Sequence, residues 1–347
     1  MTAFLDFVGL CEKELRLCGV RTGERVAVLS QGTERLDYAD AFLAAARRLG
    51  GDAYHVRLPS TLNGAGLDSL VVGNTPLSGN AAAVDALKQA DLLIDLIFLL
   101  FSPEQLAIQA SGTRVLSVVE PVAQLAKLLP TDGQRERIEA AGELLSAART
   151  LRVTSPHGTD VTYRLNTYPT ILEYGFTDTP GRWDHWPSGF LFTGGDDDGV
   201  DGRVVLGPGD IVFPFTSYVR EPIHIAIEHG RVVDIRGGFD AALLRDYMAS
   251  FDDPDAYGIS HIGWGMHENA RASSIAVDFQ GIGMEARATY GNVLFSTGPN
   301  GELGGTNHSP CHVDMPLHGC TLTLDDEPVV VAGDIAVPAL QAPSRRR

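Results

Sequence analysis

The sequence predicts two domains, an α/β N-terminal domain with a parallel sheet and a mixed, β-rich α+β C-terminal domain. Through the first half, continuous apolar strand patterns alternate with helical patterns, which is typical of a parallel sheet. Through the second half, short strand patterns are separated by Gly, Pro and Asp turns. A chain of 347 residues with 44% hydrophobic content can bury two cores. We expect the domains to span residues 1–148 and 149–347.

The first half opens with a helix whose apolar residues recur at helical spacing, from Phe4 to Cys18. Strands are expected at Arg25–Ser30, Ala53–Leu58, Leu92–Leu100 and Val115–Val119, and helices at Asp37–Leu49, Asn80–Ala90 and Thr131–Ala148. The turn after the first strand reads SQGTERLD and has one glycine where a dinucleotide fingerprint needs three. We therefore interpret this domain as a scaffold that supplies a loop over the active site.

The second half contains six short strand patterns and one clear helix, Asp240–Ser250. The strands are expected at Leu151–Thr154, Asp160–Leu165, Gly202–Leu206, Ile211–Phe215, Ile223–Glu228 and Arg231–Ile235. The acidic run GDDDGVD lacks the spacing and the terminal Glu of an EF-hand loop, so a solvated loop is expected there.

Composition excludes several classes of partner. The net charge of -17 argues against nucleic acid and anionic membranes, because both need a basic surface. The four cysteines form no C-x-x-C pair, and acidic residues interrupt the apolar stretch that a signal peptide would need. The longest apolar run, Leu92–Phe101, is too short to span a bilayer. We expect a soluble cytoplasmic protein that assembles as a homo-oligomer.

The stretch Gly291–Asp314 contains the first candidate functional residues. A strand and a glycine-rich loop there lead to a His-x-Asp pair, His312 and Asp314. Residues two apart on a strand point to one face, so an imidazole and a carboxylate converge there. These are two of the three ligands of a 2-His-1-carboxylate iron site. On its own, such a pair is more often solvated than metal-binding. The surrounding motifs therefore decide whether a metal site is predicted here.

Two further segments place histidines among glycines and aromatic rings. Tyr174–Thr193 brings Trp183, His185 and Trp186 into four positions, and Tyr257–Ala270 contains His261. The first segment reads either as an aromatic loop at a domain interface or as a pocket wall on which a flat ring stacks. In the second case His185 is the acid/base group.

Four long motifs in this half, GRWDHWPSGFLF, GISHIGWG, YGNVLFSTGPN and SPCHVDMPL, resemble the 2,5-dihydroxypyridine 5,6-dioxygenase family. The resemblance extends over nearly the whole chain. It implies Fe(II) held by His261, His312 and Asp314, with His185 and Ser296 as catalytic residues near the substrate. For Ser296 two roles are open: its hydroxyl binds oxygen or water near the metal, or it only satisfies backbone groups. The resemblance also implies opening of the pyridine ring between C5 and C6 with O2, and a two-domain fold related to the thermophile-type metalloaminopeptidases.

The relationship to the metalloaminopeptidases suggests an alternative to the dioxygenase function, namely a metallohydrolase that acts on peptides or aromatic amines. Where those aminopeptidases carry a ligand Glu and a ligand His, this chain has Phe190 and Leu294. The loss of two ligands favours one metal and oxygen chemistry over two-metal hydrolysis. A non-catalytic relative is the third possibility, and it is disfavoured because all three ligand residues are present.

The expected substrate contacts are aromatic or apolar: Trp183, Trp186, Phe190, Leu294 and Phe101. Phe101 is a departure, since related sequences carry His in the segment LLFSPEQ. The change removes a potential proton-transfer partner without touching the metal ligands. Three consequences are open: lower activity, a proton relay that passes to His185, or a somewhat different ring as the substrate. The sequence therefore determines the type of reaction better than the identity of the ring.

Overall fold

The computed structural model describes residues 6–60, 75–100, 102–276 and 281–345. The chain divides into two compact units. The first comprises Met1–Pro130 with Tyr174–Ser188, and the second comprises Thr131–Glu173 with Gly189–Arg347. No helix in the described ranges is both long enough and apolar enough to cross a membrane.

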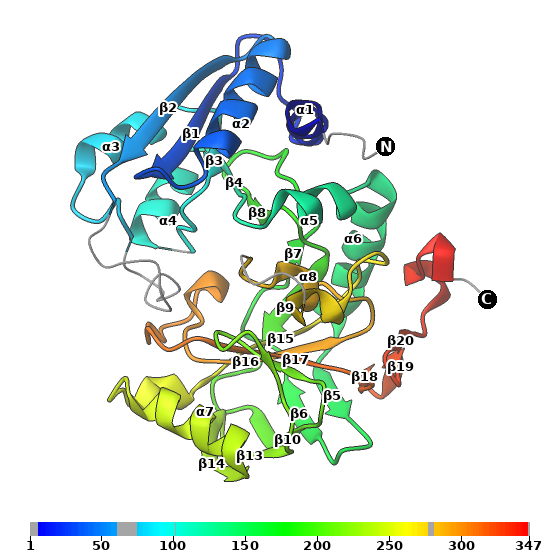
Figure 1. Cartoon of the computed structure of the whole chain (residues 1–347). Coiled ribbons are helices and arrows are strands. Elements are labelled where there is room, and N and C mark those ends of the chain that lie inside the picture. The colour runs from blue at the N-terminus through cyan, green and yellow to red at the C-terminus, as the bar shows by residue number, and fades with distance from the viewer. Residues whose placement is uncertain (1–5, 61–74, 101, 277–280, 346–347) are drawn as a thin grey trace. The chain divides into compact units, whose positions relative to one another are not determined.

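The first unit is built on a parallel sheet with the strand order β2-β1-β3-β4-β8. Its strands are β1 (Arg25–Gln31), β2 (Asp52–Leu58), β3 (Leu92–Asp95), β4 (Arg114–Ser117) and β8 (Trp183–His185). Its helices are α1 (Phe7–Leu17), α2 (Leu36–Arg48), α3 (Ala81–Leu87), α4 (Pro103–Ala110) and α5 (Val122–Lys127). The predicted α/β architecture of this half is confirmed (Figure 1).

Strand β3 is shorter than predicted and ends at Asp95 instead of Leu100. The buried carboxylate of Asp95 accepts hydrogen bonds from the backbone amides of Ile97 and Leu99 and from the Ser117 hydroxyl. Because the carboxylate satisfies amides that a strand would pair with a neighbour, the chain turns there. The apolar run therefore contains a strand and a turn, which hydrophobicity alone does not distinguish.

The second unit contains two antiparallel sheets and a short hairpin. The larger sheet has the order β14-β13-β10-β6-β5-β18-β19-β20, and the smaller one has the order β17-β16-β15-β9-β7. The strands of the larger sheet are β5 (Thr150–Thr154), β6 (Asp160–Arg164), β10 (Val200–Leu206), β13 (Ile223–Glu228), β14 (Arg231–Gly237), β18 (Thr321–Leu324), β19 (Glu327–Val331) and β20 (Asp334–Ile335).

The strands of the smaller sheet are β7 (Ile171–Glu173), β9 (Phe190–Gly194), β15 (Ile259–Gly265), β16 (Val293–Thr297) and β17 (Val313–Leu317), and β11 (Ile211–Val212) pairs with β12 (Ser217–Tyr218). The helices are α6 (Asp132–Ala147), α7 (Phe239–Ala249) and α8 (Met284–Arg287). Short 3-10 helices lie at Pro254–Tyr257, Ala272–Ala276, Gly301–Leu303, Pro338–Leu340 and Pro343–Arg345. The predicted β-rich character and the predicted helix at Asp240–Ser250 are confirmed.

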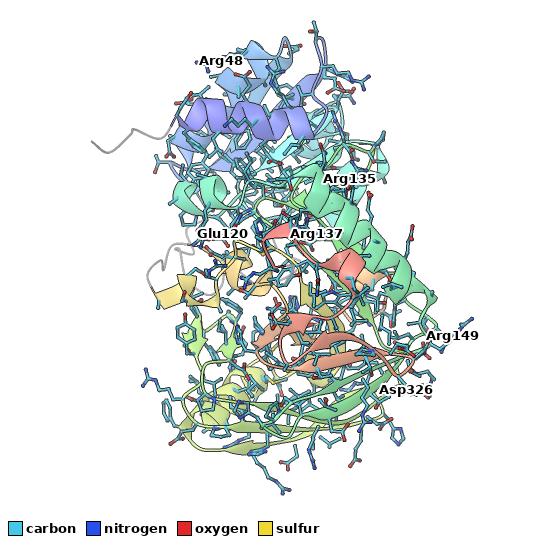
Figure 2. The ribbon with its side chains drawn as sticks, turned by 90° about the vertical axis from the view of Figure 1, so that its right-hand side faces the viewer. Arg48, Glu120, Arg135, Arg137, Arg149 and Asp326 are labelled. Carbon is cyan, nitrogen blue, oxygen red and sulfur yellow. The ribbon has the colours of Figure 1, made fainter. Side chains whose placement is uncertain are left out.

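The division of the chain differs from the expected single boundary between residues 148 and 149. Helix α6 belongs to the second unit, because it packs on β7 and β9. The fit is close: a Cβ on Gly142 would lie 2.5 Å from the Leu172 side chain. Arg137 on the same helix is buried (labelled in Figure 2). It forms a 2.7 Å ion pair with Glu268, in the segment after β15.

The aromatic segment around His185 also differs from the predicted loop. Residues 183–185 form β8, which adds a fifth strand to the parallel sheet of the first unit beside β4. The Asp184 carboxylate is fully buried and accepts backbone hydrogen bonds from Tyr174, Gly175 and His185. A short strand framed by Pro and Gly has too few residues to show a strand period, which is why the pattern suggests a loop.

Candidate metal centre

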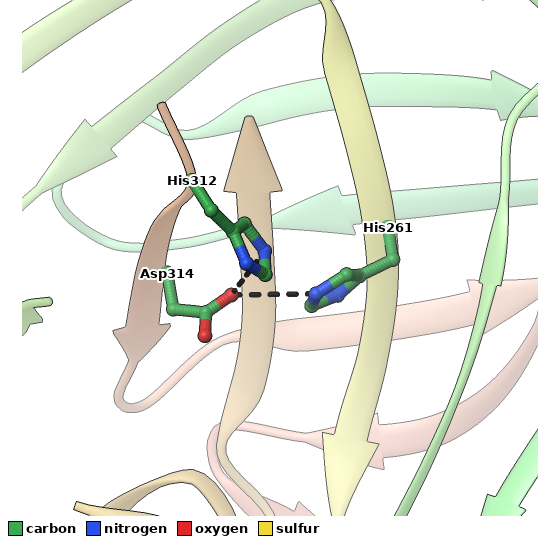
Figure 3. A group of neighbouring side chains, drawn as sticks. All are labelled: His261, His312 and Asp314. Carbon is green, nitrogen blue, oxygen red and sulfur yellow. Dashed lines mark ion pairs between the residues drawn. The ribbon is translucent and has the colours of Figure 1, made fainter. Parts of the chain in front are cut away.

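Three neighbouring strands of the smaller sheet position the predicted ligands. His261 lies within β15, Asp314 lies within β17, and His312 immediately precedes β17. Strand β16 runs between β15 and β17 and pairs Ser296 with Asp314. The three side chains point toward one another from these strands (Figure 3). The sheet order thus brings together residues that are far apart in the chain.

Asp314 Oδ1 is the meeting point of the group. It lies 3.3 Å from His261 Nε2 and 3.3 Å from His312 Nε2. One ligand atom from each residue can be chosen so that all lie within 4.8 Å of one another. The two imidazole rings are T-shaped, with centroids 5.4 Å apart. Over the described ranges, this is the one group of three or more His, Cys, Asp or Glu side chains with such spacing.

The polar atoms of this group fit a bound cation. His261 and Asp314 are buried, at 5% and 7% exposure. Asp314 Oδ1 and His312 Nε2 are shielded from solvent and make no hydrogen bond of normal geometry. Buried polar atoms that lack a normal hydrogen bond are costly, so a cation held among converging ones would stabilise them. Two imidazole nitrogens and one carboxylate oxygen suit a divalent transition metal and leave coordination positions open.

Arg287, at the end of α8, occupies the other oxygen of Asp314. Its Nε lies 2.7 Å from Asp314 Oδ2, and its guanidinium lies 4.0 Å above the centre of the Phe213 ring. One guanidinium nitrogen also donates to the carbonyl of Ile282. With Oδ2 held in this way, Oδ1 is the oxygen available to a metal. Sequence reasoning missed Arg287, because no spacing or motif relates it to the ligands.

The electrostatics keep Asp314 ionised. Burial opposes its charge, but the neighbouring His312 and Arg287 outweigh burial and hold the pKa of Asp314 well below its usual range. For His312, burial disfavours the imidazolium, but the Asp314 carboxylate outweighs burial and raises the pKa of His312. A proton on His312 and a metal ion are therefore competing partners for the same carboxylate-facing nitrogen.

Ser296 is fully buried on β16 and contacts the backbone of His261. Its Oγ accepts a hydrogen bond from the His261 amide at 3.0 Å and donates one to the His261 carbonyl at 3.3 Å. The sequence left two roles open for this hydroxyl, a catalytic one and satisfaction of the backbone. The observed contacts are of the second kind.

Apolar side chains lie in the same sheet as the ligands. Phe190 and Phe192 on β9 are stacked with centroids 5.9 Å apart, and the Phe192 ring lies 4.8 Å from the ring of His261. Leu294 is buried on β16 two residues before Ser296, so both side chains point to one face of the strand. The residues at the two lost aminopeptidase ligand positions thus add apolar surface to this sheet. Their contact with a substrate stays a prediction.

The remaining predicted site residues belong to the first unit. His185 is buried, with the rings of Trp183 and Phe98 at 4.6 and 5.2 Å. Trp183 joins the apolar core of that unit and donates its indole N–H to the Ser117 hydroxyl. Trp186 is buried, with its ring edge-on to that of Phe42. The roles of these residues toward a substrate stay predictions.

Phe101 lies outside the described residues. The structure therefore brings the predicted metal ligands together with Ser296, Phe190 and Leu294 in one sheet. It places His185, Trp183 and Trp186 in the other compact unit.

The described part of the chain combines an aminopeptidase-like fold with one candidate metal centre, the group of His261, His312 and Asp314. The expected fold is confirmed by similarity to the solved structure of wild-type AmpT from Thermus thermophilus, with a TM-score of 0.65. That likeness covers 95% of this chain and 99% of AmpT at 16% identity, and it therefore supports the fold alone.

Sequence comparison identifies the family. The profile of the 2,5-dihydroxypyridine 5,6-dioxygenase family matches residues 6–337. The 2,5-dihydroxypyridine 5,6-dioxygenase of Pseudomonas putida KT2440 is 47% identical over 332 residues, which cover 94% of this chain and 95% of the relative. The chain belongs to the 2,5-dihydroxypyridine 5,6-dioxygenase family.

A solved structure agrees with this assignment. The structure of 2,5-dihydroxypyridine dioxygenase from Pseudomonas putida KT2440 matches with a TM-score of 0.93 at 46% identity. The match covers 96% of this chain and 98% of that one. The family resemblance predicted from the four motifs is confirmed, and the chain is an oxygenase.

Substitution of His261, His312 or Asp314 by Ala tests the metal centre. Each variant should lose most bound metal after anaerobic reconstitution with Fe(II), because a three-ligand site has no spare ligand. Elemental analysis of the desalted protein measures the loss, and circular dichroism checks the fold. His308→Ala is the matched control, since His308 is an exposed histidine in the loop before His312. Full metal content in one of the three variants would remove that residue from the ligand set.

Proposed function

We propose that this protein is an Fe(II)-dependent ring-cleaving dioxygenase that opens 2,5-dihydroxypyridine between C5 and C6 to give N-formylmaleamate, in nicotinate or pyridine degradation. The observation that supports this most is the buried His261, His312 and Asp314 group in a chain of this family. Two imidazoles and one carboxylate form the ligand set of non-haem Fe(II) oxygenases.

The ligand residues would hold the iron through His261 Nε2, His312 Nε2 and Asp314 Oδ1. When bound, Fe(II) supplies open coordination positions for dioxygen and for a substrate oxygen. Arg287 keeps the second Asp314 oxygen occupied, so the carboxylate offers one oxygen to the metal. The guanidinium also offsets the negative charge that a deprotonated substrate hydroxyl brings to a buried site.

The apolar residues of the sheet suit a flat ring. In the proposal, Phe190 and Leu294 form a wall where a two-metal enzyme has ligands, so no second cation is held there. Placing an ion against such a wall without ligands costs far more than apolar contacts return. This is the reason to prefer ring cleavage over the metallohydrolase alternative.

His185 is the proposed general base that removes or transfers the proton of the substrate hydroxyl. Trp183, Trp186 and Phe101 are the proposed aromatic contacts of the substrate. Since Phe101 stands where relatives carry His, the proton transfer rests on His185. The proposed partners are a small hydroxylated pyridine and O2, with no nucleic acid and no membrane, in the cytoplasm. The expected homo-oligomer stays a prediction.

The proposed reaction predicts oxygen uptake that depends on both Fe(II) and 2,5-dihydroxypyridine. Protein reconstituted anaerobically with Fe(II) should consume O2 and lose the pyridine absorbance together when oxygen is admitted. Gentisate, a benzene analogue, and other hydroxypyridines in the same panel define the ring. Protein reconstituted with zinc, cobalt or manganese should cleave no aminoacyl substrate. Two metals per chain by elemental analysis, together with peptide hydrolysis, would replace the dioxygenase proposal by the hydrolase alternative.

His185→Ala tests the proposed base. The variant should keep its iron and lose on the order of 100-fold in turnover, the usual scale for general acid–base catalysis. Oxygen uptake across a range of pH measures the effect. His55→Gln is the control for a histidine of the same unit, since His55 is bonded to Ser30 and has no proposed catalytic role. Near-normal rates in His185→Ala would return His185 to a structural role.

A further inference from the structure

Strand β15 contains a bulge at the residue that would bind the metal. Against β16, Ile259 pairs with Thr297 and Ile262 pairs with Phe295, so the register shifts between them. Ser260 and His261 therefore lie opposite a single residue, Ser296. On its other side β15 keeps a regular register with β9. A bulge of this kind interrupts the ladder on one side and turns a side chain in a new direction.

The Ser296 hydroxyl fills the interrupted ladder. Its oxygen accepts from the amide of His261 and donates to the carbonyl of the same residue, at 3.0 and 3.3 Å. Both bonds are shielded from water, since Ser296 is fully buried and His261 is 5% exposed. A buried peptide group left without a partner is costly, so these hydrogen bonds resist rotation of the His261 backbone.

Ser296 also lies between two ligands in the sheet. It pairs with Asp314 on β17 and lies opposite the bulge on β15. Because its hydroxyl is bonded to the His261 backbone, the small side chain leaves the His261 imidazole free to approach Asp314 Oδ1 at 3.3 Å. We propose that Ser296 is a positioning residue, which holds the bulge of β15 so that His261 Nε2 faces the metal position.

The inference rests on the proposed metal centre and differs from a substrate-binding role for Ser296. A hydroxyl that contacts substrate changes KM and leaves the affinity for the metal alone unchanged. A hydroxyl that orients a ligand changes metal affinity when no substrate is present. Groups that orient metal ligands typically affect affinity by 10–100-fold.

The test is titration of the metal-free protein with Co(II), without substrate, followed by the ligand-field absorbance of the bound ion. Ser296→Ala should weaken Co(II) binding by about 10-fold or more while circular dichroism shows a retained fold. Ser296→Thr keeps the hydroxyl and should recover most of the affinity. Wild-type affinity in Ser296→Ala, with a raised KM for the pyridine, would overturn the inference in favour of substrate contact.

Thr297→Val is the matched control, because it removes a buried hydroxyl from the adjacent position of β16. That hydroxyl makes no hydrogen bond within the described part of the chain. Thr297→Val should bind Co(II) like the wild type, and an equal loss in both variants would show a general weakening of β16 and contradict the inference. If His261→Ala also bound Co(II) normally, the proposed metal centre itself would fail, which is a different result.

Hydrogen exchange of the wild-type protein covers the case in which Ser296→Ala does not fold. The His261 amide should exchange slowly in metal-free protein, since it is buried and bonded to Ser296 Oγ. Rapid exchange of this amide, with slow exchange at its neighbours in β15, would contradict the proposed role of Ser296 in holding the His261 backbone.

Discussion

The sharing of one buried carboxylate oxygen by two imidazoles is the constraint on which the rest of the second unit depends. Asp314 Oδ1 faces His261 and His312 at equal distances of 3.3 Å, and Arg287 holds Oδ2 at 2.7 Å. An ionised carboxylate is costly to bury without compensation. Arg287 supplies a permanent positive charge, and a divalent metal would supply the rest. The buried negative charge is therefore compensated in part by Arg287 and suits a cation as its second partner.

The smaller sheet brings the two histidines and Asp314 to these distances. Strands β15, β16 and β17 are adjacent, so the spacing of the ladder sets the distances among side chains from residues that are distant in sequence. The bulge opposite Ser296 and the position of His312 just before β17 are departures from regular strand structure. Both occur at candidate metal ligands. Regular pairing sets the positions of the strands, and the two irregularities lie at His261 and next to His312.

Much of this could be predicted from the sequence, and the reasons for the misses are physical. The α/β first half follows from alternating patterns, and the three side chains of the candidate metal centre follow from long motifs shared with the family. The end of β3 at Asp95 depends on a side-chain hydrogen bond, which hydrophobicity does not report. A single boundary near residue 148 would put helix α6 in the first unit and strand β8 in the second, and the structure has the opposite assignment. The contacts that decide this are long-range: β8 pairs with β4, and α6 packs on β7 and β9. Arg287 was missed for the same reason.

The central claim, one iron centre at Asp314 Oδ1, is tested most directly by anomalous diffraction at the iron edge from crystals grown anaerobically with Fe(II). We predict one strong anomalous peak per chain, within bonding distance of His261 Nε2, His312 Nε2 and Asp314 Oδ1, with Arg287 still on Asp314 Oδ2. A second peak beside Phe190 and Leu294, or an iron site that lacks any of the three residues, would contradict the account.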